Sequence, residues 1–237
     1  MDLGLAGKVA LVTASSKGLG RASARALVGE GAAVAINSRD PERLRSTAEE
    51  LGGDVLALPA DVTDRDAPRR LVEATVERFG ALHVLVANAG GPPKGRALEV
   101  DDATLEAALN ANLLTFVRLV REAVPHMRAA GWGRICLIAS SSVKQPIPDL
   151  ATSNTARAGL WGWAKTAAQD LIDEGITLNL ACPGLHATDR VKELGFAGRL
   201  GDPDDFGRVV AFLCSEQAGF VSGAALQVDG ASTLGLL

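Results

Sequence analysis

Residues Lys8–Gly20, with the sequence KVALVTASSKGLG, constrain the fold of this chain more than any other stretch. The apolar run 9–12 is typical of a strand that is buried on both faces of a parallel sheet. Gly18 and Gly20 interrupt this strand, and a helical pattern of apolar residues begins directly after them. A strand, a glycine loop and a helix N-terminus in this order can bind an anion, because free N–H groups and the positive end of the helix dipole face the loop. A tight turn without a ligand would use the same glycines, so the anion-site hypothesis depends on the rest of the chain.

Apolar runs and helical patterns alternate along the remainder of the chain. We expect strands at 9–12, 33–37, 55–58, 82–87, 134–139, 177–181 and 225–228. We expect helices after the glycine loop and at 42–51, 65–79, 102–130, 150–173 and 203–214, with an interruption of the 102–130 helix around 110–112. Such alternation predicts right-handed crossovers and a parallel sheet. The expected fold is therefore α/β, a doubly wound parallel sheet with helices on both faces, as a single domain over residues 1–237.

Composition narrows the cellular setting. The chain has 237 residues, of which 47% are hydrophobic and 22% are charged, and its net charge is −4. These values predict a large buried core and give no sign of nucleic-acid or membrane affinity. Cys136, Cys182 and Cys214 lie in apolar runs without metal-site spacing, which is typical of core residues in a reduced compartment. Since we recognise neither a signal peptide nor an apolar run of membrane-spanning length, we expect a cytoplasmic protein.

Polar and glycine clusters follow the expected strands at their carboxyl ends. In sheets of this type, ligands bind outside the carboxyl ends of the strands, at the point where the strand order reverses. We therefore expect one large site rather than scattered loops. The clusters are Ala14–Gly20, Ser38-Arg39, Asp61, Asn88–Gly91, Ser140–Ser142 and Pro183–Thr188.

These clusters resemble the motifs of the short-chain dehydrogenase/reductase family, in particular its β-ketoacyl-carrier-protein reductase-like members. Thr13–Gly20 is similar to the family's T-G-x-x-x-G-x-G cofactor loop, Asn88-Ala89-Gly90 to its N-A-G turn, and Pro183-Gly184 with Thr188 to the segment that holds the nicotinamide carboxamide. Phe220–Gly223 and Val228–Gly230 are similar to its C-terminal signature. The resemblance implies a Rossmann-like fold and cofactor contacts at Thr13, Ser15, Ser16, Lys17, Gly18, Leu19, Gly20, Ser38, Arg39, Asp61, Val62, Asn88, Ala89, Gly90, Arg157, Pro183, Gly184 and Thr188.

The cofactor motifs depart from the family pattern in two respects. Ala14 stands where the first glycine is usual, and its methyl group is tolerable if the backbone keeps a negative φ. The second strand ends without the carboxylate that binds the ribose 2′-hydroxyl in NAD-specific sites. Arg39 and Lys17 are available instead to pair with a 2′-phosphate, with no carboxylate expected to oppose them, although both could be solvated surface cations. We therefore expect NADP(H) rather than NAD(H).

The catalytic motif departs further. The resemblance implies that Ser140 is the catalytic serine and that Asn112 belongs to the catalytic set, although Asn112 could equally be a helix-kink residue that bonds backbone. Ser153 and Arg157 then stand where the family carries its acid/base tyrosine and its lysine, and the chain contains no tyrosine at all. A serine hydroxyl is a much weaker acid than a phenol, and a guanidinium cannot relay a proton, although it can still bond ribose hydroxyls. We therefore expect cofactor binding to be retained and ordinary carbonyl reduction to be compromised.

Other groups could supply the missing acid. His186 has a suitable intrinsic pKa, with a surface or helix-capping role as the alternative, and Lys144 and Asp149 lie in the loop after Ser140. Ser141 and Ser142 either polarise a carbonyl or cap this loop. The segment 189–202, which contains Phe196, is short for a substrate lid and predicts an open pocket.

Three functions follow from these observations. The first is an NADP(H)-dependent oxidoreductase with an atypical active site, in which Ser140 polarises a carbonyl of a small or carrier-bound substrate. The second is a non-redox enzyme on the same fold, such as a dehydratase, isomerase or cyclase, and the third is a catalytically silent binding subunit.

Assembly is also suggested by the sequence. Helices 102–130 and 150–173 are apolar over much of their circumference, which predicts a homodimer or homotetramer through them, unless they form one unusually apolar layer. The residues concerned are Leu113, Phe116, Val117, Leu119, Val120, Leu160, Trp161 and Trp163.

Overall fold

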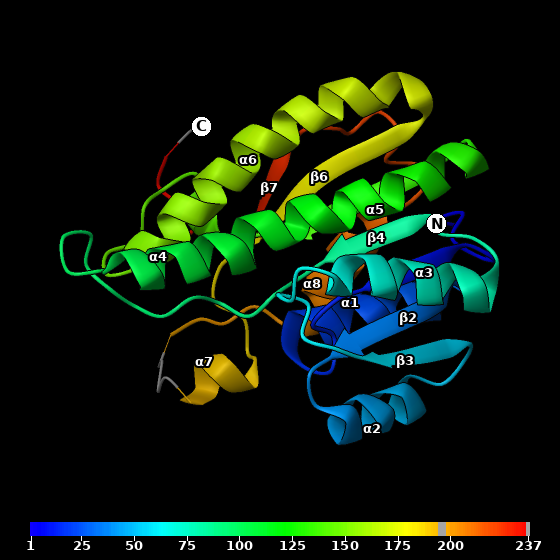
Figure 1. The fold of residues 1–237 in the computed structure, drawn as a ribbon, viewed down its shortest axis with the longest axis horizontal. Coiled ribbons are helices and arrows are strands. Elements are labelled where there is room, and N and C mark those ends of the chain that lie inside the picture. The colour runs from blue at the N-terminus through cyan, green and yellow to red at the C-terminus, as the bar shows by residue number, and fades with distance from the viewer. Residues whose placement is uncertain (194–197, 236–237) are drawn as a thin grey trace.

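Strand β1 (Val9–Val12) lies inside a parallel sheet that is flanked by helices on both faces (Figure 1). The computed structural model describes residues 1–193 and 198–235. Seven strands are arranged in the order β3-β2-β1-β4-β5-β6-β7, and every neighbouring pair is parallel. The order reverses between β1 and β4, as expected for a doubly wound sheet. The other strands are β2 (Ala33–Ser38), β3 (Val55–Pro59), β4 (Val84–Ala87), β5 (Gly133–Ile138), β6 (Ile176–Pro183) and β7 (Ala225–Val228).

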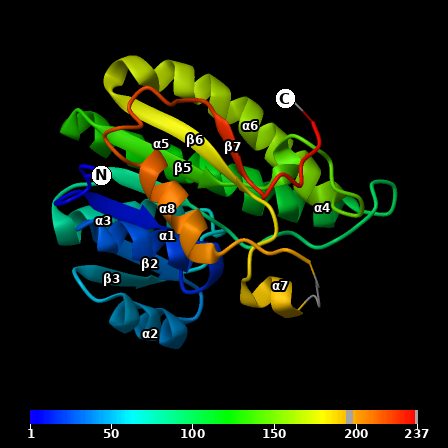
Figure 2. The same cartoon turned by 180° about the vertical axis from the view of Figure 1, so that it is seen from behind.

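The helices form two layers with separate apolar cores. One layer contains α3 (Ala67–Phe79), α5 (Thr115–Ala130) and α6 (Ala151–Leu171). The other contains α1 (Gly18–Gly29), α2 (Pro41–Leu51) and α8 (Pro203–Leu213), which cover the face seen in Figure 2. Strands β1, β4 and β5 contribute alternate residues to both cores, which is why they are continuous apolar runs. The fold class predicted from the sequence is confirmed.

The predicted interruption near residue 110 is also observed. Helix α4 (Asp102–Leu109) passes into a π-helical turn, Asn110–Leu114, and then into α5. The hydroxyl of Thr115 donates to the carbonyl of Asn110, five residues earlier, at 2.8 Å. Such π turns are frequent at functional sites.

Several boundaries differ from those expected. Strand β4 begins at Val84 rather than at residue 82, and α6 ends in a 3-10 turn, Ile172–Glu174. Helix α7 (Asp189–Glu193) was not expected; it lies outside both helical layers (Figure 1). Because α7 is a short, charged segment, it shows no apolar periodicity.

The expectations for cysteine and for the membrane can also be compared with the structure. Cys136, Cys182 and Cys214 are buried free thiols, as predicted. Among residues 1–193 and 198–235, no helix is both long enough and apolar enough to cross a bilayer.

Candidate functional site at the carboxyl edge of the sheet

The predicted clusters meet at one edge of the sheet because all the strands run in the same direction. The loops after β1 and β2 and the chain after β3 lie on one side of the strand reversal, and the loops after β4, β5 and β6 lie on the other. Dinucleotides bind across such a reversal, with one half on each side. The site can therefore be described as a β1–β3 half and a β4–β6 half.

A reciprocal pair of hydrogen bonds joins β1 to β4 at the reversal. The Thr13 hydroxyl donates to the Asn88 carbonyl at 2.7 Å and accepts from the Asn88 N–H at 2.8 Å. The Asn88 side chain donates in turn to the Ala14 carbonyl at 3.1 Å. Two predicted cofactor residues, Thr13 and Asn88, thus fix the loop after β1 to the end of β4.

The glycine loop packs tightly on itself and on Asn88 where it enters α1. A Cβ atom on Gly20 would lie 2.5 Å from the Ala14 carbonyl oxygen and 2.8 Å from the Asn88 amide nitrogen. Glycine is therefore required where the loop enters α1. No side chain among the described residues caps the N-terminus of this helix, so its first N–H groups remain available to an anion.

The backbone of Ala14 does not have the negative φ that was expected for it. Its φ is +46°, in the left-handed region, rather than negative. The Ala14 N–H donates to the Asn37 side-chain oxygen at 3.3 Å, so both of its backbone polar groups are engaged. The alanine thus adopts the conformation of the glycine that the family usually has there, at a cost of about 1–2 kcal/mol.

Asn37 is a buried residue that the sequence reasoning did not assign to the site. Its amide nitrogen donates to the carbonyls of Leu58 and Ala60, at 2.9 and 3.1 Å. Its backbone N–H donates to the hydroxyl of Ser15, which itself donates to the Val12 carbonyl at 2.7 Å. The signal available in the sequence was a polar residue inside an otherwise apolar strand. The Ser15 hydroxyl is thus committed to joining β1 and β2.

Ser16 lies beside Ser38, the last residue of β2. The Ser16 hydroxyl donates to the Ser38 hydroxyl at 2.8 Å, and its carbonyl accepts from Thr47 of α2. Next to them, Lys17 is exposed and lines a polar cavity of about 440 Å³. The remaining lining residues are Arg21, Glu42, Arg43, Ser46, Glu50 and Asp189.

Arg39 differs from expectation because a carboxylate does oppose it. Its guanidinium lies 3.6 Å from the Asp61 carboxylate, since β2 and β3 pair in register up to Ser38 and Pro59. Partial burial acts to raise the pKa of Asp61. Hydrogen bonds from Thr63 and the Arg39 charge outweigh that effect, so this pKa lies below its ordinary value. Arg39 itself remains 77% exposed at its side chain, so this surface ion pair is weak and can be exchanged.

The neighbouring predicted residues divide between core and surface. The side chain of Val62 is buried in the core beneath α3. Ala89 is buried beside β4, whereas Gly90 is exposed. Leu19 is half-buried and packs on the core of the α1 layer.

The loop after β6 returns to the glycine loop. A Cβ atom on Gly184 would lie 2.8 Å from the Cα of Asp229, so this position has no room for a side chain. Pro183 ends β6, and Thr188 approaches Gly18, where its methyl carbon would lie 3.6 Å from an added Cβ. Of the residues predicted to hold the nicotinamide end, Thr188 therefore borders the glycine loop.

Three serines lie together beyond the end of β5. The Ser142 N–H donates to the Ser140 hydroxyl at 3.1 Å, and the oxygens of the Ser142 and Ser153 hydroxyls are 3.4 Å apart. Ser140 therefore caps a 3-10 turn, Ser141–Val143, with its oxygen and keeps its O–H for donation. Ser142 and Ser153 are both buried.

Arg157 lies one helical turn after Ser153, on the same side of α6. Its Nη1 donates to the Ile138 carbonyl and its Nη2 to the Asn112 side-chain oxygen, both at 3.0 Å. Asn112 is in the π turn, so its oxygen binds a side chain and not the backbone that the alternative expectation proposed. Among the described residues, no partner lies within hydrogen-bond distance of Asn112 Nδ2, which is a buried donor and requires a water molecule or a ligand atom.

Two cations, Arg157 and Lys144, lie near the buried Cys182 thiol beside these serines. Burial raises the pKa of the Cys182 thiol to about 12, although the charges of Arg157 and Lys144 and a hydrogen bond from the Ser140 backbone act in the opposite direction. The Lys144 ammonium lies 5.7 Å from the centre of the Trp161 ring.

His186 is neither at the surface nor at a helix cap, in contrast to the alternative considered for it. Its ring is buried edge-on against Phe206, with 5.2 Å between ring centres, and its Nδ1 lies 3.2 Å from the Gly184 carbonyl oxygen. Asp149 is exposed, with φ +58°, and lies 3.9 Å from Arg96. Phe196 of the expected lid lies outside the described residues.

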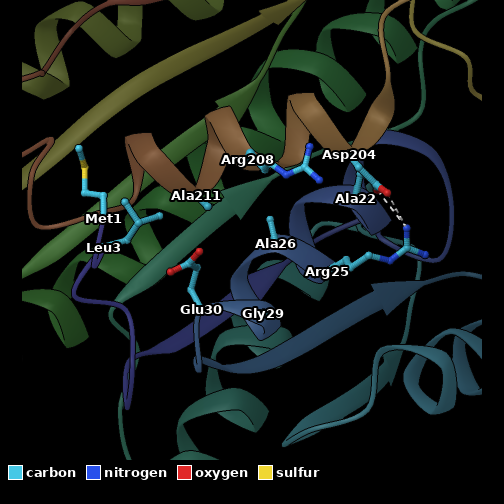
Figure 3. A pocket seen from close by; sticks show the side chains of 10 residues that line it. All are labelled: Met1, Leu3, Ala22, Arg25, Ala26, Gly29, Glu30, Asp204, Arg208 and Ala211. Atoms are coloured by element: carbon cyan, nitrogen blue, oxygen red, sulfur yellow. Dashed lines mark hydrogen bonds and ion pairs between the residues drawn. The ribbon is translucent and has the colours of Figure 1, made fainter.

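A separate cavity of about 390 Å³ lies in the groove between α1 and α8 (Figure 3). Arg25 crosses this groove to Asp204, at 3.0 Å. The cavity contains none of the residues predicted for catalysis or cofactor binding, so we place the functional site at the carboxyl edge. Its lining is Met1, Leu3, Ala22, Arg25, Ala26, Gly29, Glu30, Asp204, Arg208 and Ala211.

Known proteins share both the sequence pattern and the fold. Residues 13–233 match the family model described as enoyl-(acyl carrier protein) reductase. Dehydrogenase/reductase SDR family member 4 from Sus scrofa is 32% identical over 246 residues, which cover 95% of this chain and 87% of that protein. The 3-oxoacyl-(acyl-carrier-protein) reductase of Haemophilus influenzae is 32% identical over 235 residues, covering 94% and 97%. The chain belongs to the short-chain dehydrogenase/reductase family.

Solved structures agree with this assignment. The L-sorbose reductase of Gluconobacter frateurii, crystallised with NADPH and L-sorbose, superposes with a TM-score of 0.91 at 32% identity and covers 97% of this chain and 98% of its own. This family membership supports an oxidoreductase with a nicotinamide cofactor. The uncapped N-terminus of α1 fits the pyrophosphate of such a cofactor.

Proposed function

We propose that this chain is an NADP(H)-dependent oxidoreductase with an atypical active site. It would act on a carbonyl or hydroxyl group of a small or carrier-bound substrate without the family's tyrosine–lysine pair. The observation that carries this proposal is the assembly of the glycine loop, Asn88, Gly184 and Thr188 around one edge of the sheet.

Different residues would hold the two ends of the cofactor. Ser16, Lys17, Ser38, Arg39 and Asp61 hold the adenosine end, and Pro183, Gly184 and Thr188 hold the nicotinamide end. The cofactor supplies or accepts hydride when it is bound. Ser140 and Ser153 donate hydrogen bonds to the substrate oxygen, and Arg157, held by Asn112 and Ile138, adds a permanent positive charge.

The preference for NADP(H) depends on two exposed cations near the end of β2. Lys17 lines the polar cavity and Arg39 is only weakly engaged by Asp61. A 2′-phosphate can recruit both through charge-assisted hydrogen bonds. NAD-specific sites carry a carboxylate at the end of the second strand. Ser38 at the end of β2 has an uncharged hydroxyl, which does not repel the phosphate.

The test is a titration with NADPH and NADH, followed by fluorescence and by melting temperature. We expect tight NADPH binding, weaker NADH binding, and at least a fivefold loss of NADPH affinity in Lys17→Gln or Arg39→Gln with little change for NADH. Arg45→Gln is the matched control, because Arg45 is exposed on α2 and does not line the cavity. Failure of both nucleotides to bind would rule out the redox function.

A non-redox enzyme is the second candidate, and the rigid setting of Arg157 favours it. The guanidinium is bonded to a backbone carbonyl and to Asn112, so it cannot relay a proton as a lysine could. A dehydratase, isomerase or cyclase would bind the nucleotide without changing its absorbance during turnover. A silent binding subunit would show neither turnover nor absorbance change.

We also propose a homodimer or homotetramer through α4–α5 and α6, in the cytoplasm. Five of the eight apolar residues cited for this expectation are buried within the chain itself, namely Phe116, Val117, Leu119, Val120 and Leu160. Leu113, Trp161 and Trp163 are only partly buried, and Leu114 is 43% exposed. The apolar residues that can still support assembly are therefore these four partly buried or exposed side chains.

A further inference from the structure

The short tail after β7, red in Figure 2, begins with a firmly bonded turn at Asp229. The Asp229 carboxylate accepts hydrogen bonds from the N–H groups of Ala231 and Thr233, both at 3.0 Å, and from the Thr233 hydroxyl at 2.6 Å. Partial burial acts to raise the pKa of Asp229, but the hydrogen bonds outweigh it, so this pKa lies below its ordinary value. The carboxylate is therefore ionised at neutral pH and holds the turn in place.

This turn rests on the loop that follows β6. The Gly184 N–H donates to the Val228 carbonyl at 3.0 Å, and a Cβ atom on Gly184 would lie 2.8 Å from the Cα of Asp229. Gly184 is one of the residues that we expect to hold the nicotinamide end of the cofactor. The root of the tail therefore adjoins that end of the candidate site.

The far end of the tail reaches the loop after β5. The Leu234 N–H donates to the Gln145 side-chain oxygen at 2.8 Å. Gln145 is itself bonded to the turn that Ser140 caps, because its N–H donates to the Ser141 carbonyl at 3.2 Å. The tail therefore connects the loop after β6 to the serine turn after β5.

The two ends of the tail are held with unequal strength. Asp229 accepts three hydrogen bonds, whereas the bond between Leu234 and Gln145 is exposed to solvent. Leu234 is 85% exposed, so its side chain adds little packing. Segments with exposed hydrogen bonds and few buried contacts are those that open most readily. The geometry is that of a hinge at Asp229 and an exchangeable latch at Gln145.

We propose that residues 229–235 form a strap over the nicotinamide end of the site, held closed by the hydrogen bond between Leu234 and Gln145. The strap opens when this bond breaks, so that substrate enters and product leaves. This inference rests on the proposed redox function and assigns the gate of its site. Segment 189–202 is short for a substrate lid, and the strap supplies a second cover that excludes water while it is closed.

The first test follows the latch in the protein without nucleotide. Hydrogen exchange at the Leu234 amide should become at least fivefold faster in Gln145→Met, which removes the acceptor. Gln145→Glu keeps an acceptor oxygen at this position and should stay within twofold of the wild type. Gln217→Met is the matched control, because Gln217 makes an exposed hydrogen bond to Asp2 in the loop that precedes β7. Unchanged exchange in Gln145→Met would overturn the latch.

The second test measures what the strap covers. The nicotinamide ring of bound NADPH fluoresces, and quenching by acrylamide, a neutral molecule, reports how accessible that ring is to solvent. We expect the quenching constant to rise at least twofold in Gln145→Met and in Leu234→Pro, since proline has no N–H to donate. Leu234→Ala keeps this N–H and is the control for loss of the side chain. The double variant should be no more accessible than either single variant, because both substitutions remove the same bond.

The outcomes separate the strap from the proposed function. Equal quenching in all variants that bind NADPH would overturn the strap and leave the redox function intact. An effect of Leu234→Ala as large as that of Leu234→Pro, or additive effects in the double variant, would overturn the hydrogen bond as the latch. If the wild type binds no NADPH, the proposed function fails, and the strap fails with it as a cover for the nicotinamide.

Discussion

Ala14 illustrates how the site constrains single residues. It adopts a left-handed φ of +46°, and it is held there by Asn37 on its N–H and by Asn88 on its carbonyl. Apart from Asn and Asp, an L-residue seldom takes this conformation, and the cost is about 1–2 kcal/mol. The surrounding hydrogen bonds compensate for it, as is usual for strained residues at functional sites.

Ala14→Gly should therefore stabilise the protein. Relief of the strained φ exceeds the extra entropy of glycine in the unfolded chain, and we expect a net gain of about 0.5–1 kcal/mol. Urea unfolding with unchanged m-value measures it. Ala26→Gly, in the helical backbone of α1, is the control and should destabilise by about 1 kcal/mol. A loss of stability in Ala14→Gly would mean that packing of the Ala14 methyl group stabilises the fold by more than the strained φ costs.

For single residues, the sequence predicted which side chains lie at the carboxyl edge better than it predicted which partners those side chains contact. Lys17, Asn88 and Ser140 lie at the carboxyl edge of the sheet, because strand ends and turn residues determine their positions. The pairing of Arg39 with Asp61 depends on the register of β2 with β3, which no local pattern contains. The burial of His186 likewise depends on Phe206 of a distant helix.

At the scale of elements, α1 and α8 pack with unusually close backbones. A Cβ atom on Gly207 of α8 would lie 2.3 Å from the Ala22 carbonyl oxygen of α1. Glycine is thus required at the crossing, because a backbone neighbour cannot move aside as a side chain can. The close approach fixes α1, and with it the glycine loop that precedes α1.

Gly207→Ala should destabilise the protein by about 1–3 kcal/mol or more, because it overpacks the crossing. Gly29→Ala is the matched control at the exposed end of α1, where an added Cβ meets nothing within 4 Å, and it should gain a few tenths to 1 kcal/mol from helix propensity. Thermal unfolding of both variants provides the comparison. Equal stability of the two variants would show that α1 and α8 can move apart without a loss in the free energy of unfolding.

The elements themselves were largely predictable. Continuous apolar runs identified the strands, and Asn110-Ala111-Asn112 marked the point where the long helix becomes π-helical. Helix α7 could not be predicted, since five mostly charged residues carry no periodic signal.

At the scale of the whole molecule, acid should weaken the fold through His83. The Val9 N–H donates to His83 Nδ1 at 3.0 Å, so this ring atom must be unprotonated. Desolvation, and then the charge of Lys8, lower the pKa of His83 below its unfolded value of 6.5. As the pH falls through 6.5, the unfolded chain binds the proton first. The stabilisation is therefore complete above pH 6.5 and is lost between 6.5 and the lower folded pKa.

His83→Asn should flatten this part of the pH–stability curve while it keeps an acceptor for Val9. Urea midpoints between pH 7.5 and 5 measure the slope. Persistence of the full slope in the variant would assign the acid sensitivity to other groups.

The proposed oligomer is also a property at this scale. We expect sedimentation as a dimer or tetramer, and a shift toward monomer in Leu114→Lys, because Leu114 is exposed beside the π turn. Leu98→Lys is the control, since Leu98 is fully exposed in the loop before α4. A wild-type monomer would contradict the assembly.

The parallel arrangement leaves the two edges of the sheet with unequal tolerance to change. The candidate site lies where the strands end, whereas turns at the other edge contain glycines with positive φ, such as Gly52, Gly80 and Gly131. A peptide tag or a whole guest domain spliced into the turn after α2 would extend the chain away from the candidate site. This edge is thus the place to attach a reporter or a second protein without disturbing the carboxyl edge.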